Sequence, residues 1–279
     1  MLSILYGIAS ALSWGAGDFA GGLSSRKVGA YRAVFYADFF GLFLLLAAYF
    51  IYPETLPAVR VLWVSAIGGM LGTIGLLVLY YSLTKGQMSI AAPVSALFAA
   101  VLPVIVGSIT EGLPGLFQFI GFVLALAAVW LISQGDGNFH ISRLSDLRLP
   151  ILAGLGFGCY FIFMHNATQD TPSILWPMII SRVAGTLLVL SFVLARREPI
   201  GVPRGVWTVV LINATLDLFG NFFYILASKS GRLDIAAVLS SLYPGATVIL
   251  AWMLLKEHIS RWQIVGILLA LSAIALFTL

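Results

Sequence analysis

Apolar residues occur along this chain in blocks whose length matches a bilayer-spanning helix, which needs about 20 such residues. The blocks lie at residues 2–23, 31–52, 58–83, 88–109, 114–133, 149–167, 174–195, 205–228, 233–255 and 260–279. The breaks between them hold turn-forming and charged residues, such as the Ser-Ser-Arg-Lys run at 24–27, and the longest break runs from Gln134 to Arg148. The pattern predicts an all-α, polytopic membrane protein of about ten transmembrane helices.

Composition supports a lipid environment for most of the surface. Hydrophobic residues make up 61% of the chain and charged residues 9%, whereas soluble domains average roughly 45–50% and about 25%. The net charge of +4 arises mainly in the connections, which argues against nucleic acid as a partner and for contact with the bilayer surface. A lone cysteine, Cys159, excludes an intrachain disulfide and a cysteine-ligated metal cluster. The first block has no basic segment ahead of it, so we expect a retained helix rather than a signal peptide.

The sequence repeats itself about its midpoint. Ile90-Ala91-Ala92 recurs as Ile235-Ala236-Ala237, a shift of 145 residues, and the same shift aligns further residues in both directions. We therefore expect two five-helix units, at residues 1–134 and 149–279. Since five is odd, the second unit must enter the membrane from the opposite side, which predicts an inverted repeat.

Charge in the connections bears on membrane orientation. Connections after odd-numbered blocks hold ten Lys and Arg residues, whereas those after even-numbered blocks hold three. The excess of basic residues in cytoplasmic loops would then place both termini outside the cell.

Several short motifs indicate a family. The motifs are Ala11-Leu12-Ser13-Trp14-Gly15, Arg32, Tyr81-Ser82-Leu83, Thr110-Glu111, Leu255-Lys256-Glu257, and the Gln-x-x-Gly segments that begin at Gln118 and Gln263. With these motifs, the block 71–133 and its partner 219–279 resemble EamA-type repeats of the drug/metabolite transporter superfamily.

The resemblance implies a transporter with a central cavity lined mainly by the first, third, fourth, sixth, eighth and ninth helices. It implies cytoplasmic termini, contrary to the charge count, so orientation stays open. Family cargoes range over amino acids, sugars, nucleotide precursors and drugs, so membership does not identify the substrate.

An acidic residue near the centre of a predicted span needs a reason, because a charge there costs on the order of 2.5–3.5 kcal/mol. Asp217 lies in the middle of the eighth block, with Asn213 and Asn221 four residues to either side. Four-residue spacing puts all three on one helix face. This stripe predicts a proton or cation site, or a counter-ion to a substrate amine; the alternative is a hydrogen-bonded contact between helices.

Other charged residues fall within the predicted spans. Asp18 lies in a glycine-rich part of the first block and is a candidate either for the same site or for a helix-end acid. Asp38 and Arg182 lie in blocks that the resemblance assigns to the scaffold. With Arg32, they are expected to make structural pairs with carbonyls or carboxylates.

A third group of candidates combines a histidine with aromatic residues. A shift of 147 residues aligns His165 with Asp18, so His165 is a candidate proton relay, although a structural hydrogen bond is the stronger expectation. Trp14, Tyr160 and Tyr243 are the aromatic residues that we expect to wall a cavity. His140 and His258 lie in connections.

Prolines interrupt equivalent helices of the two halves. Pro93 and Pro103 fall in the fourth block, and Pro244-Gly245 in the ninth. Paired interruptions predict hinges beside a midplane site, although kinks that only serve packing would look the same. Glu111 and Glu257 end the same two blocks and are expected to act as caps.

Together these patterns predict a secondary transporter in the inner (plasma) membrane that moves a small-molecule substrate by alternating access. An amino acid or related solute, exported with protons as the coupling ion or by facilitated flow, is the expectation from the resemblance. The alternative is a membrane-embedded enzyme acting on a lipid-like substrate, which would need clustered acids or histidines that the sequence does not contain. No cofactor or metal is expected, and the chain should be a monomer or weak homodimer.

Overall fold

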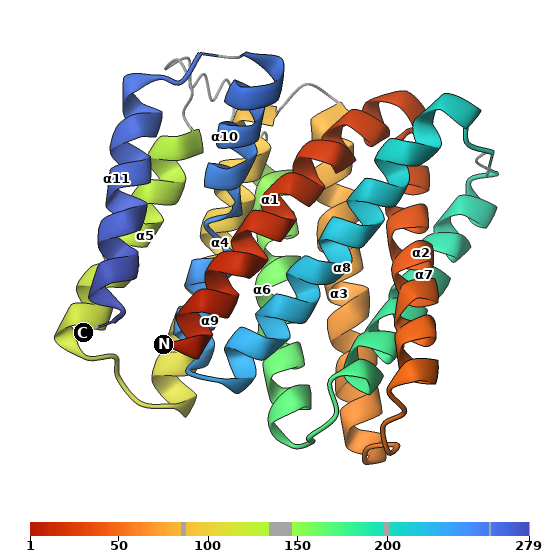
Figure 1. Ribbon diagram of the computed structural model, residues 1–279, viewed down its shortest axis with the longest axis horizontal. Coiled ribbons are helices and arrows are strands. Elements are labelled where there is room, and N and C mark those ends of the chain that lie inside the picture. The colour runs from red at the N-terminus through yellow and green to blue at the C-terminus, as the bar shows by residue number, and fades with distance from the viewer. Residues whose placement is uncertain (85–87, 134–146, 198–200, 257, 279) are drawn as a thin grey trace.

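The computed structural model describes residues 1–84, 88–133, 147–197, 201–256 and 258–278, and the regular elements in these residues are all helices (Figure 1). The helices are α1 (Leu2–Val28), α2 (Ala30–Ile51), α3 (Val59–Thr84), α4 (Met88–Thr110), α5 (Leu116–Ser133), α6 (Arg148–Gln169), α7 (Leu175–Ala195), η2 (Arg204–Val206), α8 (Trp207–Lys229), α9 (Leu233–Ser240), α10 (Tyr243–Leu255) and α11 (Arg261–Leu276). The predicted all-α class is confirmed. His140, Glu257 and the side chain of Pro93 lie outside the described residues.

The bundle is built as a polytopic membrane protein. Six helices within the described residues are long and apolar enough to cross a bilayer, and one of these spans, Leu233–Leu254, combines α9 and α10. Shorter apolar helices at 94–110, 116–132 and 261–276 complete the bundle with α1. Large apolar side chains cover the outside, as at Phe43 (64% exposed) and Trp262 (54% exposed), so the outer surface suits lipid.

The polypeptide runs up and down the bundle, and both chain ends lie on the same face (Figure 1). We call this the terminal face, and the opposite face, where α1 ends and α2 begins, the connecting face. Helices α1 and α6, which begin the two halves, run in opposite directions in Figure 1.

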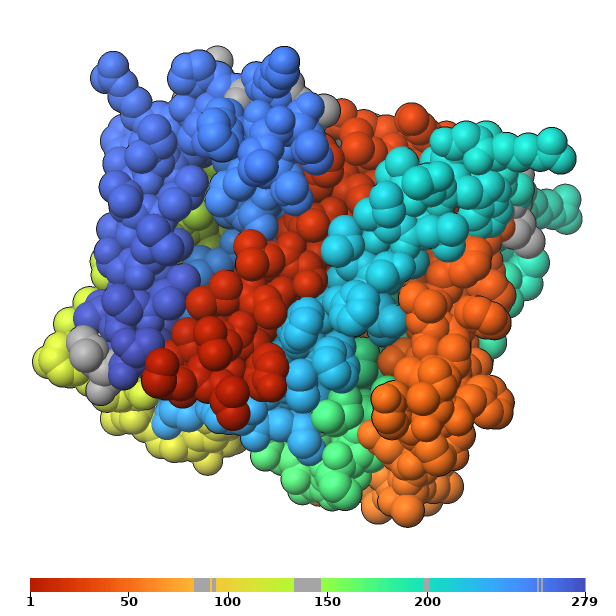
Figure 2. Space-filling model, viewed as in Figure 1, coloured from red at the N-terminus to blue at the C-terminus, as the bar shows by residue number. Residues whose placement is uncertain are grey.

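The two halves interleave. Helix α1 packs along α8, and α3 packs along α6. Helix α2 contacts α7, α4 contacts α9, and α5 contacts α11, so each of these pairs joins one helix from before residue 134 with one from after residue 147. Figure 2 shows α1 and α8 crossing one face of the molecule side by side. The space at the centre therefore lies between the halves.

The helices approach closely at glycines. A Cβ at Gly69 of α3 would overlap the backbone of Ser181 in α7, and one at Gly220 of α8 would overlap the Trp14 ring of α1. Small residues at such crossings are what allow helices to pack in lipid, where no hydrophobic force holds them together.

Helix α1 is longer than the sequence predicted. The Ser-Ser-Arg-Lys run at 24–27 was expected to be a break, but it continues the helix to Val28. The hydroxyls of Ser24 and Ser25 donate to the carbonyls of Gly21 and Gly22, so these serines cause no break. Arg26 and Lys27 occupy the last turn, where cations interact favourably with the helix dipole.

The predicted interruptions differ between the two halves. Helix α4 runs without a break past Pro103. In the second half, a turn at Ser241 and Leu242 separates α9 from α10, and Pro244 sits in the first turn of α10, where its missing N–H costs nothing. The hinge roles of Pro93, Pro103, Pro244 and Gly245 stay predictions.

Candidate functional site

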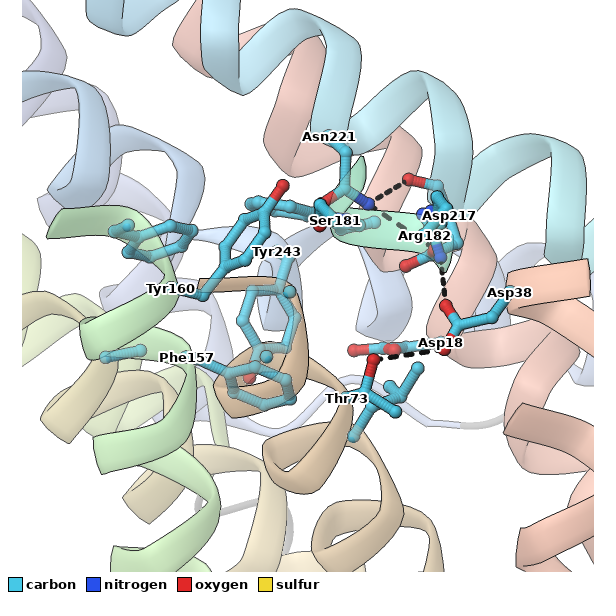
Figure 3. Close-up of a pocket in the computed structure, with 16 residues that line it drawn as sticks. Asp18, Asp38, Thr73, Phe157, Tyr160, Ser181, Arg182, Asp217, Asn221 and Tyr243 are labelled. Atoms are coloured by element: carbon cyan, nitrogen blue, oxygen red, sulfur yellow. Dashed lines mark hydrogen bonds and ion pairs between the residues drawn. The ribbon is translucent and has the colours of Figure 1, made fainter. Parts of the chain in front are cut away.

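A cavity of about 70 Å³ lies at the centre of the bundle (Figure 3). Residues of α1, α2, α3, α4, α6, α7, α8 and α10 line it, and within the described part of the chain α5 and α11 contribute none. The family resemblance predicted that most of these helices line the cavity. It assigned α2 and α7 to the scaffold, but α2 places Asp38 and α7 places Arg182 at the cavity.

An arginine on α7 organises the polar wall of the cavity. Arg182 donates to the carboxylate of Asp38 on α2 and to that of Asp217 on α8 (Figure 3). The Thr73 hydroxyl on α3 donates to the second oxygen of Asp38 over 3.0 Å. Since Arg182 is 7% exposed and Asp38 2%, these are buried charge-assisted bonds that tie four helices together.

The predicted polar stripe on α8 divides into two parts. Asp217 and Asn221 line the cavity, and the Asn221 amide donates to the Asp217 backbone carbonyl over 2.6 Å. Asn213 does not line the cavity. It is 1% exposed, and its side-chain oxygen accepts a 3.3 Å hydrogen bond from the Tyr80 hydroxyl on α3.

Asp18 on α1 contributes a third carboxylate to the cavity. Within the described residues it makes no hydrogen bond and no ion pair, in contrast to Asp38 and Asp217. One guanidinium therefore faces three carboxylates, and two negative charges remain when all three acids are ionised.

Aromatic residues form the remaining wall. Trp14, Tyr160 and Tyr243 all line the cavity, and their part in substrate binding stays a prediction. The Trp14 ring lies 5.5 Å from that of Phe161, centroid to centroid, and 6.1 Å from that of Tyr224. The Tyr224 hydroxyl donates to the Phe161 carbonyl over 2.6 Å, and this cluster lies on the side of the cavity that faces the terminal face (Figure 1).

His165 lies outside the cavity lining. Its Nε2 is 3.0 Å from a carboxylate oxygen of Glu111, and its Nδ1 is 2.7 Å from the Ser228 hydroxyl. Six of the eight predicted substrate-site residues thus line the cavity: Trp14, Asp18, Tyr160, Asp217, Asn221 and Tyr243.

Asp38, Arg182 and Thr73 line the cavity but were not predicted to do so. The sequence did carry a signal for Asp38 and Arg182, because a charged residue within an apolar span marks a functional position by default. The resemblance outweighed that signal by assigning their helices to the scaffold.

Known proteins were compared with this chain. A 26% identical relative, an uncharacterized transporter of Archaeoglobus fulgidus, covers 100% of this chain and 99% of its own length. An uncharacterized protein of Methanocaldococcus jannaschii is 28% identical over 131 residues, which are 47% of this chain and 94% of that protein. A crystal structure with 17% identity superposes with a TM-score of 0.80 over 99% of this chain and 96% of the other, which shows a common fold.

The family comparison covers both halves. The model of the EamA-like transporter family matches residues 1–134 and again 147–279. The chain therefore belongs to the EamA-like transporter family, and it is a membrane transporter of the drug/metabolite type.

Proposed function

We propose that this protein is a secondary transporter of small metabolites that carry a positively charged amine, such as an amino acid or a related solute. It works by alternating access and exports its substrate across the plasma membrane in exchange for protons. The observation that carries the proposal is the charge imbalance of the cavity, where Arg182 is the one cation that faces Asp18, Asp38 and Asp217 among the described lining residues.

The imbalance requires positive charge from elsewhere. An uncompensated ion buried away from water costs several kcal/mol, so two further carboxylate charges cannot stay unbalanced in the middle of a bilayer. Protons can neutralise them in the empty protein, and a substrate amine can replace a proton when it binds. Competition between amine and proton for one site is the requirement for exchange.

Asp18 suits the amine best. Its carboxylate faces the cavity without a partner among the described residues, whereas those of Asp38 and Asp217 are held by Arg182. Trp14 and Tyr243 line the same cavity, and their aromatic faces attract cations.

Alternating access is supported by the arrangement of the halves. The cavity lies between them, and α1 and α6 run in opposite directions (Figure 1). The first helix of each half packs against the third helix of the other half, as α1 with α8 and α6 with α3. The half-length relative of Methanocaldococcus jannaschii is consistent with one half being a unit in itself. These observations support two inverted units, at 1–134 and 149–279, that rock against each other.

The size of the cavity supports motion as well. Pockets for drug-sized ligands have volumes of about 300–1,000 Å³. A cavity of about 70 Å³ has room for a few water molecules, so loading a metabolite requires the halves to separate.

The test is uptake by proteoliposomes of radiolabelled amines, each paired with a neutral analogue that lacks the amine. We expect an amine to move in the direction opposite to protons when a proton gradient is applied, and its neutral analogue to show little flux. Asp18→Asn should lower amine flux about tenfold or more, as expected for the loss of one charged contact. Asp170→Asn is the matched control, because that carboxylate is 47% exposed and pairs with Arg60 away from the cavity. Equal flux of amines and neutral analogues would refute the proposal, and turnover of a lipid without flux would favour an enzyme.

A further inference from the structure

A second ionisable group lies beyond the aromatic floor of the cavity. Phe161 and Tyr224 form that floor, and His165 and Ser228 each follow one of them by four residues on the same helix. Residues four apart share a helix face, so His165 and Ser228 are one turn closer to the terminal face. Their side chains bond to each other over 2.7 Å.

This layer connects the two halves. Glu111, which follows α4, accepts from His165 over 3.0 Å and from the backbone N–H of Leu233, the first residue of α9, over 3.1 Å. Arg232 donates to the backbone carbonyls of Glu111 over 3.2 Å and of Gly112 over 2.8 Å. All these bonds must break for α4 to part from α6 and α9.

On the connecting-face side of the cavity, the two halves are joined by a bond between neutral groups. The Tyr80 hydroxyl on α3 donates to the side-chain oxygen of Asn213 on α8, and both residues are 1% exposed. This bond also joins the two halves. The terminal-face closure contains a histidine and a carboxylate, whereas Tyr80 and Asn213 are both neutral at physiological pH, so protons act on these two bonds differently.

We propose that His165 and Glu111 form a proton-binding site that holds the cavity closed towards the terminal face. A proton on His165 turns its hydrogen bond to an ionised Glu111 into an ion pair in which both partners carry charge, which strengthens the bond. The side chains are 12% and 23% exposed, so protons from the aqueous phase at that face can reach them. Loss of the proton weakens the closure, and the site goes beyond the cavity carboxylates that the proposed function uses.

The other charged groups around His165 have partners of their own. Arg232 pairs with Asp234 over 2.7 Å, and these hydrogen bonds raise the pKa of the guanidinium above its ordinary value, so it stays charged. Lys229 donates to the carbonyls of Thr168 and Thr171, at the end of α6.

Farther along that connection, Asp170 pairs with Arg60. Histidine is the side chain that ordinarily gains and loses its proton between pH 5 and 8. His165 is therefore the group through which this layer responds to pH.

The experiment measures how readily a cysteine in the cavity reacts. Ala99 lines the cavity and is fully buried, so Ala99→Cys, with the single native cysteine removed as Cys159→Ala, reports opening. The protein is reconstituted in nanodiscs without substrate and labelled with a maleimide from pH 6 to pH 8.5. Each rate is divided by that of an exposed reporter, Ser230→Cys, to correct for the general rise of thiol reactivity with pH.

We expect the normalised rate to rise about tenfold between pH 6 and pH 8.5, because the bond between His165 and Glu111 weakens when the imidazole loses its positive charge. His165→Gln should be fast at every pH. Glu111→Gln should give the same flat profile; it retains an oxygen for the N–H of Leu233 and so keeps the start of α9. Tyr80→Phe, which breaks the opposite closure, should be faster than the parent and still respond to pH.

A pH profile that persists in both His165→Gln and Glu111→Gln would overturn the proposal, and so would a parent rate that does not change with pH. Labelling needs no substrate, so this outcome is independent of whether amines are transported.

Discussion

Arg182 offers the sharpest test of the cavity's electrostatics. Arg182→Met keeps much of the side-chain volume and removes the only positive charge among the described residues of the cavity lining. Asp38 and Asp217 lose their shared partner, so the cavity must take up one more proton in the folded state.

The cost follows from the proton. Each pH unit is worth about 1.4 kcal/mol for one proton, and a free aspartate titrates near pH 4, so uptake of that proton costs about 4 kcal/mol at pH 7 and about 1.5 kcal/mol at pH 5. The larger value agrees with the range of about 3–5 kcal/mol for breaking a buried ion pair by removing one partner. The folded variant holds a proton that the unfolded chain releases, so its deficit grows as pH rises.

The assay is reversible unfolding in mixed micelles with increasing SDS, followed by the fluorescence of the seven tryptophans, at pH 5 and pH 7. Arg182→Met combined with Asp217→Asn removes a charge of each sign and should recover most of the loss. Arg32→Met is the control, because Arg32 makes an exposed bond to the Gly201 carbonyl and should cost less than about 1 kcal/mol. A deficit below about 1 kcal/mol at pH 7, or one that is equal at both pH values, would refute this description of the cavity.

Two further predictions concern packing and capping, and both are measured by the same unfolding assay. Gly69→Ala should destabilise the protein by about 1–3 kcal/mol, because its Cβ would overlap the Ser181 backbone. Gly201 has open space around it, so Gly201→Ala should change stability by less than about 0.5 kcal/mol. Equal effects of the two substitutions would contradict the close α3–α7 crossing. Ser260→Ala should cost about 1 kcal/mol of stability, because the Ser260 hydroxyl accepts from the Gln263 N–H at the start of α11 and completes a capping box. Ser260→Thr should retain most of that bond. A loss of stability in Ser260→Thr as large as in Ser260→Ala would argue against the capping role.

The fold was predictable because the bilayer fixes the length of each apolar block. The block predicted at 174–195 is the helix Leu175–Ala195, and the one at 31–52 is Ala30–Ile51. The end of α1 was predicted too early because serine hydroxyls can donate hydrogen bonds to backbone carbonyls of their own helix, as Ser24 and Ser25 do. A hydropathy pattern does not reveal such bonds.

The cavity lining was predictable where its signal lay within one helix. Four-residue spacing pointed to Asp217 and Asn221 on one face of α8, and both line the cavity. The same spacing also selected Asn213, which lies one turn farther along and meets Tyr80 instead. A stripe on a helix does not show where along its length the cavity ends.

Contacts between the halves could not be predicted. Arg182 and Asp38 are 144 residues apart in sequence, and only the packing of α2 against α7 brings them together. The shift of 147 residues that aligned His165 with Asp18 implied equivalent positions, yet His165 contacts Glu111 beyond the floor of the cavity.

Proton release on substrate binding tests the central claim most directly. A transported amine is added to the purified protein in a weakly buffered solution at pH 7, and the protons released are counted against the amine bound. If the carboxylates of the cavity are neutralised by protons in the empty state, about one proton should leave for each monovalent amine that binds. Amine binding without any release of protons would contradict a cavity in which the two cations compete for Asp18, Asp38 and Asp217.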